Sequence, residues 1–95
     1  MNLKDKAIVV TGSTTGIGKA IAKRCLENGA SVLIHGLEAE LAEETWQELD
    51  PERERSDVLI ADLLDPDTPK RLNAAMIKRF GKIDGLVNNA AMVGT

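Results

Sequence analysis

The chain alternates between short uncharged apolar runs and longer segments in which apolar residues recur every three or four positions. Short β-branched runs are typical of strands buried on both faces of a parallel sheet. Apolar residues at helical spacing are typical of a helix with one face packed on such a sheet. The pattern predicts strands at residues 7–10, 31–35, 57–61 and from residue 85. It predicts helices at residues 17–28, 38–49 and 66–80 between them.

Each predicted helix has an inward stripe of apolar side chains. The first stripe contains Ile17, Ile21, Ala22, Cys25 and Leu26. The second contains Leu41, Ala42, Thr45, Trp46 and Leu49, and the acidic residues of that helix are expected to face solvent. The third contains Leu72, Ala75, Met76 and Phe80. We expect Asp65 to cap this third helix, Pro66 to occupy its first position and Gly81 to end it.

The order strand-helix-strand-helix-strand-helix-strand predicts an α/β fold, a doubly wound parallel sheet of the Rossmann-like kind. Right-handed connections place the first three strands in the order 3-2-1 and the fourth beside the first. Ligands of such sheets bind at the carboxyl ends of the strands. We therefore expect the turn at residues 12–18 to lie close to Gly36, Asp62 and Asn88.

A glycine-rich turn directly follows the first predicted strand. Gly12, Gly16 and Gly18 remove Cβ where the backbone must bend sharply and where a helix packs closely on the strand before it. The first amides of that helix and the positive end of its dipole favour a phosphate group. The context predicts a dinucleotide pyrophosphate over the turn, and the alternative is a tight turn with a purely structural role.

A nucleoside-triphosphate loop is excluded by two residues. That loop needs four residues between its first glycine and the Gly-Lys pair, and Ser13 stands at the position of that first glycine. It also needs Ser or Thr after the lysine to hold magnesium, and Ala20 has no hydroxyl group.

Composition narrows the classes of partner and site. Ninety-five residues make one small domain at most, and a net charge of −3 without a basic patch argues against a nucleic-acid partner. No apolar run approaches the length of a membrane span, and the first strand begins too early for a signal peptide, so a cytoplasmic protein is expected. Cys25 and His35 are the single residues of their kinds, which predicts no metal site. We expect Cys25 to be a buried structural thiol.

Residues 11–18, 61–63 and 88–91 together resemble the short-chain dehydrogenase/reductase family, in the family's order and at its spacing. The resemblance spans the whole chain. It implies an oxidoreductase that moves a hydride between NAD(H) or NADP(H) and an alcohol or carbonyl group of a small-molecule substrate. It also implies a homo-oligomer for the full-length protein.

The resemblance further implies which residues contact the cofactor. In the turn formed around Gly12, Gly16 and Gly18, the resemblance implies contacts to the pyrophosphate and ribose from Ser13, Thr14, Gly16 and Ile17. It assigns the adenine to Asp62 and Leu63, and the adenosine ribose to Asn89 and Ala90. Asn88 is implied to brace the central sheet, and Ala91 stands where the family commonly has glycine.

The family's catalytic tyrosine has no counterpart, because the chain contains no tyrosine. We therefore assign no catalytic residue and interpret residues 1–95 as the N-terminal part of a single NAD(P)-binding domain, truncated after the fourth strand. The alternative is a stand-alone dinucleotide-binding or sensing module without catalysis. Such a module would protect its edge with charge or proline, and residues 85–88 have neither, which favours the truncated enzyme.

Cofactor choice is predicted from the end of the second strand. An acidic residue there accepts from the ribose 2′-OH of NAD, and an arginine nearby accommodates the 2′-phosphate of NADP. Gly36 stands where the acid is common, and Leu37 stands where family members that use NADP often have arginine. Thr15 is neutral and Glu38 is acidic and close, so the balance favours NAD.

Overall fold

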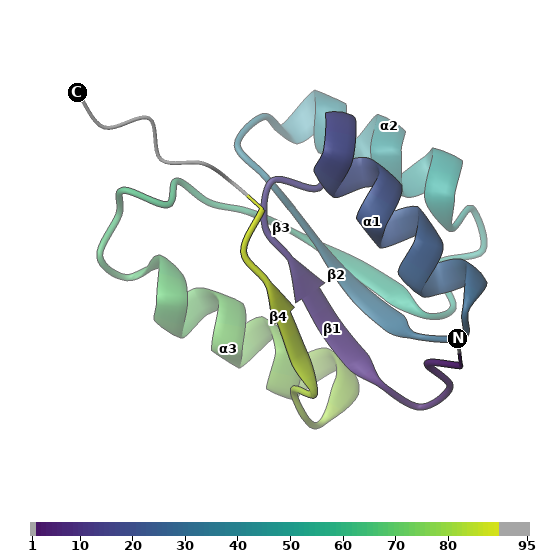
Figure 1. The fold of residues 1–95 in the computed structure, drawn as a ribbon. Helices are drawn as coiled ribbons and strands as arrows, with labels where there is room; N and C mark the ends of the chain where they lie inside the picture. Colours follow the sequence, from purple (N-terminus) through teal and green to yellow (C-terminus); the bar gives the residue numbers. More distant parts are fainter. Residues whose placement is uncertain (1, 90–95) are drawn as a thin grey trace.

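The computed structural model describes residues 2–89 of the chain. In chain order the elements are β1 (Ala7–Val10), α1 (Gly16–Glu27), β2 (Ser31–Gly36), α2 (Ala39–Leu49), β3 (Ser56–Ile60), α3 (Thr68–Phe80) and β4 (Gly85–Val87) (Figure 1). The sheet has the strand order β3-β2-β1-β4, and each neighbouring pair is parallel. The predicted fold class and strand order are confirmed.

The sheet is covered on both faces. Helices α1 and α2 lie on one face and α3 on the other (Figure 1). Ile8 and Val10 of β1 pack with the buried side chains of α1, whereas Ala7 and Val9 pack with Met76 of α3. Successive side chains of a strand point to opposite faces, so a strand buried on both sides needs an unbroken apolar run.

Ile17 does not belong to the inward stripe of α1. Its side chain is 74% exposed, and the buried residues of the helix are Gly18, Ala22, Cys25 and Leu26. Ile17 lies in the first helical turn, directly after the loop that leaves β1, and it does not join the core cluster on that face of the sheet. Helical spacing alone predicted its burial incorrectly.

Helix α3 begins later than predicted, at Thr68, with Asp67 as its N-cap residue and Pro69 in its first turn. The carboxylate of Asp62 accepts the Leu64 amide at 2.9 Å, and that of Asp65 accepts the Asp67 amide at 2.9 Å. Aspartate bonds to the backbone two residues on hold the chain in turns and compete with helix formation. The predicted cap at Asp65 is therefore wrong, while Gly81 ends the helix with φ +80° as expected.

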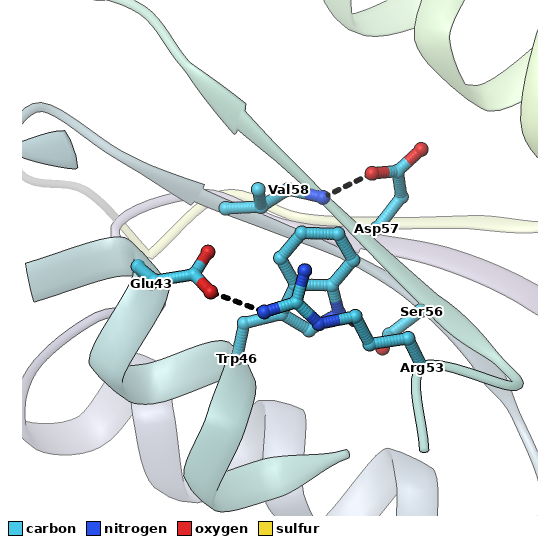
Figure 2. Close-up of polar contacts among 6 residues, drawn as sticks. All are labelled: Glu43, Trp46, Arg53, Ser56, Asp57 and Val58. Carbon is cyan, nitrogen blue, oxygen red and sulfur yellow. Dashed lines mark hydrogen bonds and ion pairs between the residues drawn. The ribbon is translucent and has the colours of Figure 1, made fainter. Parts of the chain in front are cut away.

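The connection from α2 to β3 is held by the predicted core residue Trp46. Its indole N–H donates to Ser56 Oγ at 2.9 Å, and the Arg53 guanidinium lies 3.9 Å from the ring centroid (Figure 2). Arg53 also pairs with Glu43 of α2. This cluster lies at the amino end of β3, so it fixes the strand at the edge of the sheet opposite to the predicted ligand edge.

Asp84 connects the amino ends of β1 and β4. Its Oδ2 accepts the Ala7 amide at 2.8 Å, and its own amide donates to the Ala7 carbonyl at 2.8 Å. The Ala7 amide first, and the Lys82 ammonium second, hold the pKa of the Asp84 carboxyl below its ordinary value. Within residues 2–89, no helix is long and apolar enough to cross a membrane.

Candidate cofactor-binding site

The carboxyl ends of the strands meet at one edge of the sheet, as predicted (Figure 1). The Thr11 amide donates to the Val87 carbonyl at 3.0 Å, and the Ser13 amide donates to the His35 carbonyl at 2.9 Å. The Ala61 amide donates to the Gly36 carbonyl at 3.1 Å. These bonds continue the parallel ladders beyond the strands and bring the glycine-rich turn beside the ends of β2, β3 and β4.

His35 links three of these strand ends from inside the protein. It is 3% exposed, its Nδ1 accepts the Gly12 amide at 3.0 Å, and its Nε2 lies 2.8 Å from the Ala61 carbonyl oxygen. These partners assign a neutral ring with the hydrogen on Nε2. Sequence reasoning considered His35 only as a metal ligand and missed this role. A polar residue at the end of an otherwise apolar strand run was the available signal.

Ser13 and Thr14 are held by side chains and backbone around the turn. The Ser13 side chain is fully buried, and its Oγ accepts the His35 amide at 2.8 Å. The Thr14 carbonyl accepts the Thr45 hydroxyl of α2 at 3.3 Å. The turn is therefore anchored to β2 and α2 by residues that do not belong to the glycine motif.

Gly18 allows the start of α1 to approach the turn. A Cβ on Gly18 would lie 2.2 Å from the Gly12 carbonyl oxygen and 2.5 Å from Asn89 Nδ2. Asn89 Nδ2 itself donates to the same Gly12 oxygen at 3.2 Å. Gly12 has φ +62° and Gly16 has φ +52°, a left-handed conformation that glycine adopts without steric cost.

The outer surface of the turn is open. A Cβ on Gly16 would meet no atom within 4 Å, and Ile17 and Leu37 are 74% and 64% exposed. Thr15 is the N-cap residue of α1, and its side chain makes no capping hydrogen bond. Among residues 2–89, no acceptor bonds the amides of Gly16, Ile17 or Gly18, so the helix terminus retains unpaired donors that suit an anion.

The remaining predicted residues lie at the ends of β3 and β4. Asp62 is exposed, and one of its oxygens is already bonded to the Leu64 amide. Leu63 is half-buried. Asn88 Oδ1 accepts the Thr11 hydroxyl at 3.3 Å, which ties the end of β4 to the end of β1 as expected of a bracing residue. Ala90 and Ala91 lie outside the described residues.

Metal-ligand chemistry is absent from the described part of the chain: residues 2–89 contain no cluster of three or more His, Cys, Asp or Glu side chains that could hold an ion. Cys25 is buried in α1, as predicted, and burial raises the pKa of its thiol. The donors at the start of α1 are backbone amides, which suit the phosphates of a dinucleotide.

The profile of the short-chain dehydrogenase family matches residues 6–95. The chain belongs to the short-chain dehydrogenase family. It is 37% identical over 94 residues to 1-deoxy-11-beta-hydroxypentalenate dehydrogenase of Streptomyces arenae, covering 99% of this chain and 33% of that protein. It is 33% identical over 96 residues to L-rhamnose-1-dehydrogenase of Scheffersomyces stipitis, covering 97% of this chain and 37% of that protein. This short-chain dehydrogenase chain thus spans about a third of the length of these relatives.

Solved structures of the family share the fold. The apo form of glucose dehydrogenase of Caenorhabditis elegans superposes with a TM-score of 0.89 at 33% identity, over 97% of this chain and 40% of that one. A short-chain dehydrogenase/reductase of unknown function from the same organism, solved with its cofactor, gives a TM-score of 0.83 at 32% identity over 88% of this chain and 32% of that one. The family assignment made from the three motifs is confirmed.

Proposed function

We propose that this chain forms the dinucleotide-binding part of an NAD(P)-dependent oxidoreductase that acts on an alcohol or carbonyl substrate. The proposal rests on the open glycine turn, located where the ends of all four strands meet, and on the amides of Gly16, Ile17 and Gly18, which have no acceptor among residues 2–89. Family membership supports the same assignment. When bound, the nicotinamide ring of the cofactor accepts or supplies the hydride.

The residues around the turn divide into two proposed roles. Thr14, Gly16 and Ile17 would hold the pyrophosphate and its ribose at the open outer surface of the turn, and Gly18 would contribute its backbone amide. Gly12 and Ser13 would contribute by fixing the turn, because the Ser13 hydroxyl is buried against β2 and the Gly12 amide is bonded to His35.

The adenosine end of the cofactor is proposed to lie toward β3 and β4. Asp62 with Leu63 would hold the adenine, since Asp62 is exposed and its carboxylate has acceptor capacity beyond the bond to Leu64. Asn89 and Ala90 are proposed to line the adenosine ribose. Asn89 also fixes the Gly12 carbonyl, so its side chain has a structural role in addition.

We propose that NAD is preferred to NADP. Gly36 carries no acid, and a Cβ there would lie 2.5 Å from the Thr14 methyl carbon. The exposed residue that follows is Leu37, which offers no cation to a 2′-phosphate, and Glu38 is exposed and acidic. Measured affinities for the two cofactors test this: a tenfold preference for NADP, about 1.4 kcal/mol, overturns it.

The whole protein is proposed to be a cytoplasmic homo-oligomer whose partners are the dinucleotide and a small-molecule substrate, without nucleic acid or membrane. Residues 1–95 contain no tyrosine to donate or accept the substrate proton. Loss of such a group costs on the order of a hundred- to ten-thousand-fold in rate. We therefore expect the 95-residue chain by itself to be inactive toward alcohols and ketones.

The binding proposal is tested with Ile17→Glu. The position is exposed, and an acidic residue in the first turn of a helix is favourable to the helix dipole, so the fold should be at least as stable. A carboxylate beside the pyrophosphate should weaken dinucleotide binding roughly tenfold by repulsion. The matched control is Ile77→Glu, which places the same charge on an exposed position of α3.

Titration calorimetry of the purified protein with NAD and NADP gives the result. We expect wild type and Ile77→Glu to bind the dinucleotide with equal affinity and Ile17→Glu to bind it more weakly. Equal affinity in all three proteins would show that the cofactor does not lie over the start of α1.

A further inference from the structure

His35 is the only imidazole of the chain, and it lies in the core beside the proposed cofactor turn. Its two ring nitrogens are each bonded to the backbone of a different segment, Gly12 after β1 and Ala61 after β3. We propose that His35 is a positioning residue for the dinucleotide: it holds the glycine turn and the end of β3 at the spacing that the cofactor requires. The inference rests on the proposed function.

The bond to Gly12 decides which amides of the turn face the ligand. Gly12 and Ser13 both direct their amides toward His35, one to Nδ1 and the other to the carbonyl oxygen. The amides of the following residues are then left to face outward at the start of α1. Without an acceptor at Nδ1, the part-buried Gly12 amide would lose its partner, and we expect it to rotate toward another acceptor because an unpaired donor away from water is costly.

The bond to Ala61 places the residue that follows it. The Ala61 carbonyl is fixed by the imidazole, while its amide is fixed by the Gly36 carbonyl at 3.1 Å. Asp62 therefore directly follows a residue whose amide and carbonyl are both hydrogen-bonded. The same ring thus links the proposed pyrophosphate contact and the proposed adenine contact.

Two substitutions separate the two bonds. The amide oxygen of asparagine is as many bonds from Cα as Nδ1 of histidine, so His35→Asn keeps an acceptor for Gly12 and loses the contact with Ala61. The amide nitrogen of glutamine is as many bonds from Cα as Nε2, so His35→Gln keeps the donor to Ala61. His35→Leu removes both at similar volume.

Two readouts are measured on the purified protein. The first is NAD affinity by calorimetry, at a temperature at which circular dichroism shows every variant folded. The second is hydrogen exchange of the Gly12 amide by NMR without ligand. Met76→Ala is the control, because it empties a fully buried position of α3 that contacts the other face of the sheet.

The expected result is a loss of NAD affinity of tenfold or more in His35→Leu, restored to within about threefold of wild type in His35→Asn. His35→Gln, which keeps only the Ala61 bond, should bind NAD more tightly than His35→Leu and more weakly than His35→Asn. Gly12 exchange should be slow in wild type and His35→Asn, and faster in the other two variants. Met76→Ala should lose stability while its affinity per folded molecule stays unchanged.

Two outcomes overturn the inference in different ways. Equal NAD affinity for wild type and folded His35→Leu shows that the imidazole does not position the cofactor, while the proposed binding function stands. A wild-type protein that is folded and binds neither NAD nor NADP removes the proposed function and the positioning role together, even if slow Gly12 exchange verifies the His35 bond.

Discussion

The contact between Gly18 and the turn gives the sharpest prediction for the stability of this fold. Gly18→Ala adds a single carbon in the first turn of α1. That carbon would lie 2.2 Å from the Gly12 carbonyl oxygen, at least about 0.8 Å closer than real Cβ atoms approach other heavy atoms. The nearest atom belongs to the backbone, so a side-chain rotation cannot relieve the overlap. Either the start of α1 or the turn must move.

The expected cost follows from three effects. Overpacking of this kind costs about 1–3 kcal/mol. Displacement of Asn89, whose Nδ2 donates to the same Gly12 oxygen, costs about 1 kcal/mol for the lost hydrogen bond. The higher helix propensity of alanine returns at most about 1 kcal/mol. The free energy of unfolding should therefore fall by about 1–3 kcal/mol, which lowers Tm by roughly 4–8 °C for each kcal/mol in a domain of this size.

Urea unfolding followed by circular dichroism measures the effect, with two glycine controls. A Cβ on Gly85 of β4 would lie 3.6 Å from the nearest atom, an ordinary contact, so Gly85→Ala should change stability by less than about 0.5 kcal/mol. Gly16→Ala meets no atom within 4 Å but adopts φ +52°, and left-handed strain should cost about 1 kcal/mol. If Gly18→Ala proves as stable as Gly85→Ala, the close approach of α1 to the turn is incorrect.

Three further predictions concern other parts of the chain. Because the pKa of Asp84 is lowered in the folded protein, its stabilising contribution should be lost as the pH falls below about 4. Asp84→Asn should therefore make the free energy of unfolding in urea depend less on pH, and an unchanged pH dependence contradicts this. Burial raises the pKa of Cys25, so iodoacetamide at neutral pH should label the unfolded but not the native protein. Gly36→Ala should destabilise the protein by about 1–2 kcal/mol, because the Thr14 methyl carbon would lie 2.5 Å from the new Cβ. The same substitution should cost less in a Thr14→Ser background, which lacks that methyl group, and additive effects in the double-mutant cycle would refute the contact.

The strands and their order were predictable because each strand of a sheet covered on both faces is a short, uninterrupted apolar run in the sequence. Val32, Leu33 and Ile34 are all fully buried although their side chains alternate between two faces. Such a run cannot belong to an exposed edge or to an amphipathic helix. Connection length and handedness then fix the order of the strands with few alternatives.

The boundaries near the site were less predictable, because they depend on polar side chains that bond to the backbone. Asp62 and Asp65 each bond to an amide two residues later, so the chain turns twice before α3 begins. Ile17 has the spacing of a core residue, but it lies in the first turn of α1, outside the core cluster. Periodicity describes which side of a helix is apolar and does not say where the helix begins to cover the sheet.

The glycines of the turn could be read as a motif, whereas the side chains that hold the turn could not. Gly12 is fixed by His35 from β2 and by Asn89 after β4, residues that are 23 and 77 positions away along the chain. Thr45 of α2 bonds to the next part of the turn from a third element. Glycine allows the backbone of the turn many conformations, and hydrogen bonds from these distant side chains restrict it to one. The turn is therefore already ordered before any ligand binds, so binding does not have to supply that entropy cost. For this reason we expect a substitution at buried His35 to alter NAD affinity, although we do not expect the imidazole to touch the cofactor.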